Sequence, residues 1–233
     1  MSPAMTELDL VTHYRTTRDR IVDLLAPLTD ADASRMVPAC PAWTISDAVA
    51  HVTGIAADLG AGRMPGSNTQ AWIDGHVSDR KGRRLDRLVD EWLTAGVESF
   101  IERSGSGQLL FDICAHEHDI CHALGRVGDR EADAVHACLP VMSAMLSKDL
   151  VAKGAPGALS LTSRGHSWTV GEGRVALMLE AEPFELVRIF GSRRSEHQMR
   201  ALPWQNPDGS NADVGPWLAY LAHFPYPVVD LVE

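Results

Sequence analysis

The chain has 233 residues, 45% of them hydrophobic, and it carries a formal net charge of −10. This size and composition fit one large or two small globular domains and argue against a disordered chain. The acidic charge disfavours nucleic acid and anionic membrane surfaces as partners, and no apolar run reaches the length expected of a bilayer span. Because residues 1–11 lack the apolar core of a signal peptide, we expect a cytoplasmic protein.

The first two thirds of the chain have the periodicity of amphipathic helices. Apolar residues recur every three or four positions over 10–28. Thr44 and Asp47 have the spacing of a capping box, which predicts a helix that begins there and runs to about residue 59. Residues 60–83 are rich in Gly and polar residues, and so long a loop is typical of a lid or a binding segment.

Three further helices follow in this part of the chain. Their apolar patterns cover residues 85–101, 108–125 and 135–150. The simplest assembly of these helices is an up-and-down bundle with one extra helix.

The pattern changes after residue 154. Residues 158–170 alternate in the manner of strands around a turn at 164–166, and 174–181 form a third apolar run. Pro183 then fits the first turn of a helix, and 215–223 predict a short helix within an irregular tail. We therefore expect an α+β protein with a helical bundle over 1–154 and a small α+β domain over 155–233.

A separated trio of polar residues is the most informative feature of the chain. Asp112 and His116 are four residues apart, so a helix places them one turn apart on one face. His51 lies in a helix of its own, from which it can supply a third ligand to the same divalent ion. Three protein ligands leave one position open, as in catalytic metal sites. The alternative is that these side chains merely hydrogen-bond each other at the border of a core.

Other polar residues of the helix over 108–125 each fit more than one role, or none in the site. At about 100° per residue, His118 and His122 fall on the side opposite to Asp112, where we expect them to be solvated. Asp119 either accepts a hydrogen bond from a ligand imidazole and so fixes its tautomer, or is an ordinary residue on the helix surface. Glu117 falls within the apolar arc, so it is either an acid or base, or the partner of an arginine at the domain junction in a salt bridge.

Two further features complete the candidate set. Arg193 and Arg194 suit the recognition of a substrate carboxylate by bidentate hydrogen bonds, although a solvated helix end explains them equally well. The four cysteines lack the spacing of a metal knuckle or a disulfide framework, so we expect them to be small core residues. They are Cys40, Cys114, Cys121 and Cys138.

Three segments of the chain resemble the mycothiol-dependent maleylpyruvate isomerase family, which belongs to the DinB-like superfamily of metal-binding bundles. CPAWTISDAVAHVTG (residues 40–54) resembles the Cys-Pro-Gly-Trp-Thr segment that leads to a metal-binding His. DICAHEHDICHALG (residues 112–125) resembles the family's second motif, and FELVRIFGSRRSEHQMRALPW (residues 184–204) its Gly-Arg-Arg-Ser segment. The resemblance covers nearly the whole chain, and the order of the three motifs is fairly specific.

The resemblance implies a zinc-type ion held by His51, Asp112 and His116, with solvent or a thiol at the open position. It also implies mycothiol as a cosubstrate and a smaller C-terminal domain that helps to close the site. One departure is the shorter Asp112 where Glu is expected, which allows weaker or water-bridged metal binding. Donors of nitrogen and oxygen also suit nickel, iron or manganese.

These features predict an enzyme that activates a small thiol for attack on a small electrophile. Asp119 or Glu117 would relay the proton, and Arg193 or Arg194 would hold the substrate, with thiol transfer or thiol-assisted isomerisation as the outcome. Two rival hypotheses are a metal-dependent hydrolase and a non-catalytic module that binds or regulates. The expected partners are the thiol and the electrophile, with no nucleic acid or membrane, in a monomer or a homodimer.

Overall fold

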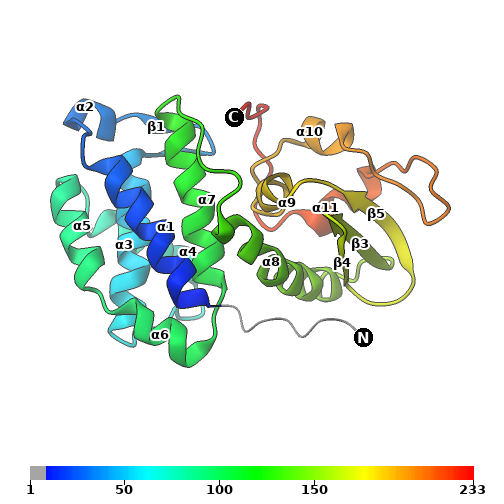
Figure 1. Cartoon of the computed structure of the whole chain (residues 1–233), viewed down its shortest axis with the longest axis horizontal. Helices are drawn as coiled ribbons and strands as arrows, with labels where there is room; N and C mark the ends of the chain where they lie inside the picture. The colour runs from blue at the N-terminus through cyan, green and yellow to red at the C-terminus, as the bar shows by residue number, and fades with distance from the viewer. Residues whose placement is uncertain (1–8) are drawn as a thin grey trace. The chain divides into compact units, whose positions relative to one another are not determined.

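The computed structural model describes residues 9–233. Residues 1–8, which contribute to the prediction that no signal peptide is present, lie outside the described residues. The chain divides into two compact units, the N-terminal unit over residues 1–128 and the C-terminal unit over 129–233. The boundary therefore lies about one helix earlier than the predicted position near residue 154. Figure 1 labels the elements of both units.

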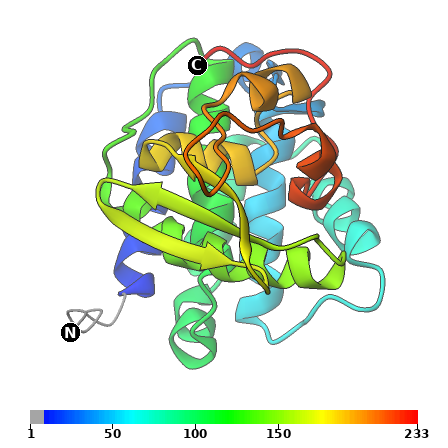
Figure 2. The ribbon, with the colours of Figure 1, turned by 90° about the vertical axis from the view of Figure 1, so that its right-hand side faces the viewer.

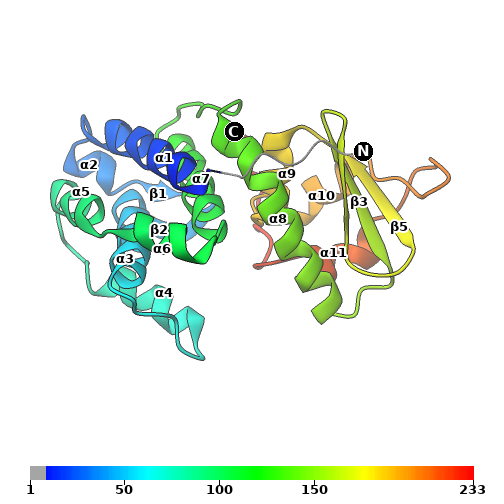
Figure 3. The ribbon, with the colours of Figure 1, turned by 60° about the horizontal axis from the view of Figure 1, so that its bottom comes forward.

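The N-terminal unit is a helical bundle with a small two-stranded hairpin. Its elements are α1 (Leu10–Leu25), α2 (Asp30–Ala33), β1 (Met36–Val37), β2 (Cys40–Thr44), α3 (Ile45–Gly60), α4 (Thr69–Ser78), α5 (Leu85–Thr94), α6 (Val97–Ser104) and α7 (Gln108–Ala123). Helix α3 is central, because it packs against α4, α5, α6 and α7, while α1 packs against α6 and α7. Figure 3 shows α4 beside α3.

Local sequence explains where α3 begins. The Thr44 hydroxyl accepts a hydrogen bond from the Asp47 amide at 3.2 Å, and the Asp47 carboxylate accepts one from the Thr44 amide at 2.9 Å. This confirms the predicted capping box, which satisfies two amides at the helix start. Eleven residues of α3 are buried, and His51 is one of them.

Three local features of this unit differ from the predictions. The helix predicted over 85–101 is two helices, α5 and α6, because Gly96 adopts a left-handed conformation with φ of 69° between them. The predicted loop over 60–83 contains α4. The hairpin of β1 and β2 was not predicted, and it places Cys40 and Trp43 directly before α3.

The C-terminal unit combines helices with a three-stranded sheet, which faces the viewer in Figure 2. Its elements are α8 (Asp133–Ala152), β3 (Ala158–Ser163), β4 (His166–Val170), β5 (Val175–Glu180), α9 (Pro183–Phe190), α10 (Glu196–Ala201), a 3₁₀ turn (Gly215–Trp217) and α11 (Leu218–Leu221). The strand order is β4-β3-β5, with β3 antiparallel to β4 and parallel to β5. The observed architecture is the predicted α+β class.

Helix α8 belongs to this second unit, since it packs against β4, α9 and α11. The apolar periodicity over 135–150 predicted a further helix of the bundle, so the predicted boundary lies after α8 rather than before it. By length and composition alone α8 is apolar enough to cross a membrane, but half of its most apolar stretch is buried inside the structure. A core helix of a soluble protein has the same properties, so this one helix is weak evidence for a membrane span.

Candidate metal centre

The N-terminal unit brings the three predicted ligand residues together. His51 comes from α3, and Asp112 and His116 come from consecutive turns of α7. The Oδ1 atom of Asp112 lies 3.7 Å from Nε2 of His51 and 3.7 Å from Nε2 of His116. One ligand atom from each residue lies within 4.8 Å of the other two. Two segments about sixty residues apart in the sequence therefore converge on one point.

The distances favour a shared cation over direct hydrogen bonds. A separation of 3.7 Å exceeds the normal range of a hydrogen bond between these atoms. Ligand atoms about 2.1 Å from a tetrahedral zinc ion lie about 3.4 Å apart, which is close to the observed spacing. Two imidazole nitrogens and one carboxylate oxygen are also a donor set that zinc accepts. The residues present therefore fit a divalent metal ion.

The exposure of the three side chains is uneven. The side chains of His51 and His116 are 5% and 4% exposed, whereas that of Asp112 is 27% exposed. The two imidazoles are thus buried, whereas the Asp112 side chain is half-buried.

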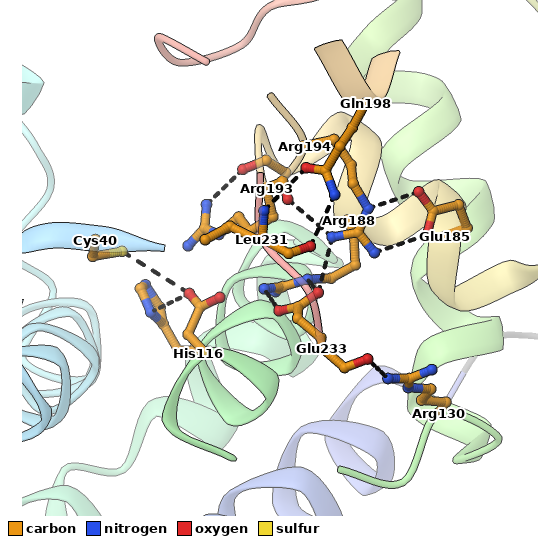
Figure 4. A network of polar contacts seen from close by, with 12 residues as sticks. Cys40, His116, Arg130, Glu185, Arg188, Arg193, Arg194, Gln198, Leu231 and Glu233 are labelled. Atoms are coloured by element: carbon orange, nitrogen blue, oxygen red, sulfur yellow. Dashed lines mark hydrogen bonds and ion pairs between the residues drawn. The ribbon is translucent and has the colours of Figure 1, made fainter. Parts of the chain in front are cut away.

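Two further polar side chains, those of Asp119 and Cys40, lie close to His116. The Nδ1 atom of His116 is 3.3 Å from Oδ2 of Asp119, and the Sγ atom of Cys40 is 4.0 Å from the same oxygen (Figure 4). Asp119 is 0% exposed, so it is not an ordinary surface residue. A carboxylate at Nδ1 fixes the tautomer in which Nε2 is free of a proton and able to bind a metal ion.

Aromatic rings surround the two imidazoles. The ring of Trp43 lies 4.9 Å from that of His51 and 5.9 Å from that of His116, measured between centroids. The His51 and His116 rings are 5.3 Å apart, and the ring of His76 from α4 lies 5.9 Å from His51. The hairpin and α4 thus each contribute a ring beside His51.

The carboxylate of Asp58 on α3 contacts two side chains of α4. Oδ2 of Asp58 accepts a hydrogen bond from the indole N–H of Trp72 at 2.7 Å and lies 3.2 Å from Nε2 of His76. Arg63 donates to Oδ1 of the same residue at 2.9 Å. Burial alone raises the pKa of Asp58, but these hydrogen bonds outweigh it and hold the pKa below its usual value. Burial lowers the pKa of His76, so that ring is neutral near pH 7.

Glu117 is buried in an ion pair on α7. Arg20 from α1 contacts both of its oxygens, with Nε 2.6 Å from Oε1 and Nη2 2.7 Å from Oε2. Because both carboxylate oxygens contact Arg20, this bidentate ion pair joins α7 to α1. An ion pair is one of the two roles that the sequence suggested for Glu117, but the arginine lies on α1 of the same unit and not at the domain junction.

Arg193 and Arg194 lie in the C-terminal unit and are both buried. Arg194 contacts both oxygens of Glu185 at 2.7 Å and one oxygen of Glu233 at 2.9 Å (Figure 4). These partners leave Arg194 less capacity for a substrate carboxylate than the sequence suggested. Arg193 donates to the carbonyl of Gly191.

The expectation that His118 is solvated was wrong. His118 is 3% exposed, while His122 is half-buried. The loop that follows α7 explains the burial, because a Cβ added to Gly128 would lie 2.5 Å from Nδ1 of His118. Periodicity within one helix cannot reveal such a covering loop.

Four residues near the centre were not predicted as site residues. Cys40 and Trp43 lie in the CPAWT motif that resembles the family's segment, and that resemblance is the signal that could have identified them. Asp58 and His76 had no local signal, since their contact joins two helices across 18 positions of sequence.

Comparisons with known proteins agree with this architecture. The family model of the mycothiol maleylpyruvate isomerase N-terminal domain matches residues 14–106, which include His51. Solved structures of the mycothiol-dependent maleylpyruvate isomerase and of a His-to-Ala mutant of it are similar, with TM-scores of 0.56 and 0.57. Each shares 14% identity and covers 90% of this chain and 96% of its own. No curated protein sequence matches the chain.

Proposed function

The N-terminal unit of this chain belongs to the family of mycothiol maleylpyruvate isomerase N-terminal domains, and from this premise we propose a metal-dependent enzyme that activates a small thiol. The thiol is mycothiol or a close analogue, and the second substrate is a small electrophile. The reaction is either transfer of the thiol or isomerisation assisted by it. The observation that carries the proposal is the convergence of His51, Asp112 and His116 on one point.

The three ligand residues would hold a zinc-type ion through His51 Nε2, Asp112 Oδ1 and His116 Nε2. When bound, such an ion lowers the pKa of a thiol at its open position, so that a thiolate is available near neutral pH. Asp119 Oδ2 lies 3.3 Å from His116 Nδ1, and this buried carboxylate would hold the ring in the required tautomer. In this proposal the thiol and the electrophile enter on the side of Asp112, whose side chain is the most exposed of the three.

The nucleophilic sulfur belongs to the cosubstrate in this proposal. Burial raises the pKa of the Cys121 thiol to about 11, so this cysteine is protonated at neutral pH. The thiolate of the cosubstrate adds to one carbon of an activated C=C bond, and the π electrons move onto the conjugated carbonyl to give an enolate. If this adduct rotates about the new C–C single bond, re-forms the C=C bond and expels the thiolate, the product is a cis–trans isomer. If the enolate instead takes up the proton that the thiol released, the C–S bond persists and the product is a thioether.

The roles of the charged residues follow from their contacts. Arg20 engages the Glu117 carboxylate, so we assign the handling of the proton near the centre to Asp119 rather than to Glu117. Recognition of a substrate carboxylate by Arg193 or Arg194 stays a prediction. Glu185 and Glu233 already bind Arg194.

A direct test incubates the zinc-loaded protein with mycothiol and a panel of electrophiles that includes maleylpyruvate. Mass spectrometry detects a thioether, and proton NMR detects an isomerised product. We expect one of these products with the wild type and at most about 1% of that rate with His51→Ala, because removal of one of three ligands empties the centre. Turnover that is unchanged by omission of the thiol, or that yields a hydrolysed substrate, would contradict the proposal.

A further inference from the structure

Helix α4 places a second buried imidazole beside His51, and the proposed ligand set does not use it. His76 is 3% exposed, and its ring lies 5.9 Å from that of His51. Gly54, one turn after His51, makes room for it, because a Cβ on Gly54 would lie 2.4 Å from the Cβ of His76. The close approach of α4 to α3 therefore depends on a residue without a side chain.

The tautomer of His76 follows from its contact with Asp58. Asp58 Oδ2 also accepts the indole N–H of Trp72, which indicates an ionised, acceptor-only carboxylate. Nε2 of His76, 3.2 Å away, must then be the donor. In the neutral ring the other nitrogen, Nδ1, carries a lone pair and can only accept.

This acceptor lies in the interior of the N-terminal unit. Nδ1 of His76 is buried and has no hydrogen-bond partner among residues 9–233. Because most buried polar atoms are hydrogen-bonded, a buried acceptor of this kind requires an explanation. His51 supplies a donor of the right type, since a histidine that binds a metal ion through Nε2 carries its proton on Nδ1.

We propose that Asp58 and His76 form an outer layer of the metal centre on the His51 side. His76 Nδ1 accepts the Nδ1–H hydrogen bond of His51 through one water molecule, and so orients the His51 ring. His76 is a positioning residue in this arrangement, and Asp58 holds its tautomer. The inference rests on the proposed function, because it requires that His51 Nε2 binds a metal ion.

Two substitutions at position 76 separate this role from simple packing. The side-chain amide of Asn reaches the place of Nδ1, so His76→Asn keeps an acceptor toward His51 and gives up the contact with Asp58. The longer amide of Gln reaches the place of Nε2, so His76→Gln keeps the contact with Asp58 and gives up the acceptor. Both replacements are polar and smaller than or similar to His, which favours a folded protein.

The readout is the zinc dissociation constant, measured by competition with a chelating dye. We expect His76→Gln to weaken zinc binding by about 10- to 100-fold, the usual effect of losing an outer-layer partner. For His76→Asn we expect a dissociation constant within about threefold of the wild type. Trp72→Phe is the matched control, since it removes one hydrogen bond to Asp58 but leaves His76 in place; zinc affinity should stay within the same range.

Two results would overturn the inference. If His76→Gln binds zinc as the wild type does, the acceptor has no role in the centre. If His76→Asn and Trp72→Phe both lose affinity while His76→Gln keeps it, the contact with Asp58 matters only for packing α4. Failure of the wild type itself to bind zinc is a distinct outcome, because it would remove the proposed function as well.

Discussion

The Nδ1 atom of His116 lies 3.3 Å from Oδ2 of Asp119, and the Asp119 side chain is completely buried. A buried carboxylate that lies beside an imidazole nitrogen fixes the tautomer and the orientation of the imidazole ring. His116 is thus fixed on one side by Asp119 and faces Asp112 with its other nitrogen.

The first prediction concerns this pair. Asp119→Asn keeps the shape of the side chain but removes the charge that holds the Nδ1–H of His116. We expect the zinc dissociation constant to rise about tenfold, as measured by chelator competition. Asp86→Asn is the control, because Asp86 is an acid with a side chain that is 58% exposed. Equal affinity of wild type and Asp119→Asn would contradict the assigned role of Asp119.

The second prediction concerns Arg20 and Glu117. Arg20→Met leaves the buried Glu117 carboxylate without its cation, so we expect a loss of about 3 kcal/mol of unfolding free energy, measured with urea. The double variant Arg20→Met/Glu117→Gln should recover part of this loss, because it removes both charges. A Glu117→Gln variant of normal stability with no turnover would instead indicate a catalytic role for Glu117.

The third prediction compares two helical glycines. Gly54→Ala places a methyl group 2.4 Å from Cβ of His76, so we expect a loss of about 2 kcal/mol of unfolding free energy from overpacking. Gly75 lies in α4, and a Cβ there meets no atom within 4 Å. Gly75→Ala should stabilise the protein by about 0.5 kcal/mol, since Ala favours a helix. Thermal or urea unfolding checks both values, and a stabilising Gly54→Ala would show that α4 is not held closely on α3.

The fourth prediction concerns the pH dependence of stability. The pKa of Asp58 is lower in the folded chain than its ordinary value of 3.8, so the folded protein binds this proton less readily than the unfolded chain does. Asp58 therefore contributes stability above pH 3.8, and this contribution is lost as the pH falls through the folded pKa. We expect the difference in unfolding free energy between wild type and Asp58→Asn to shrink below about pH 4. A difference that stays constant with pH would contradict this assignment.

Much of the fold was predictable from local patterns. The capping box at Thr44 and the apolar periodicity located α3 and α7, and alternation located the strands of the C-terminal unit. The domain boundary was not predictable in this way. The apolar residues of α8 show that it is buried, but they do not show which unit covers it.

The candidate site was predictable to a similar extent. Spacing on α7 identified Asp112 and His116 as neighbours, because one helical turn relates them. The contact of Asp58 with His76, and the burial of His118 beneath Gly128, depend on segments that meet only in the folded chain. Such contacts leave no periodic signal in the sequence.

The metal content of the purified protein tests the central claim most directly. Elemental analysis after growth with added zinc should give roughly one equivalent per chain for the wild type and for the exposed-acid control Asp86→Asn, since the three ligands form one site. The same analysis should give less than about a tenth of an equivalent for His51→Ala and for His116→Ala, because a centre with two remaining ligands binds zinc far more weakly. A wild-type protein without metal, or histidine variants that retain the full equivalent, would contradict the account.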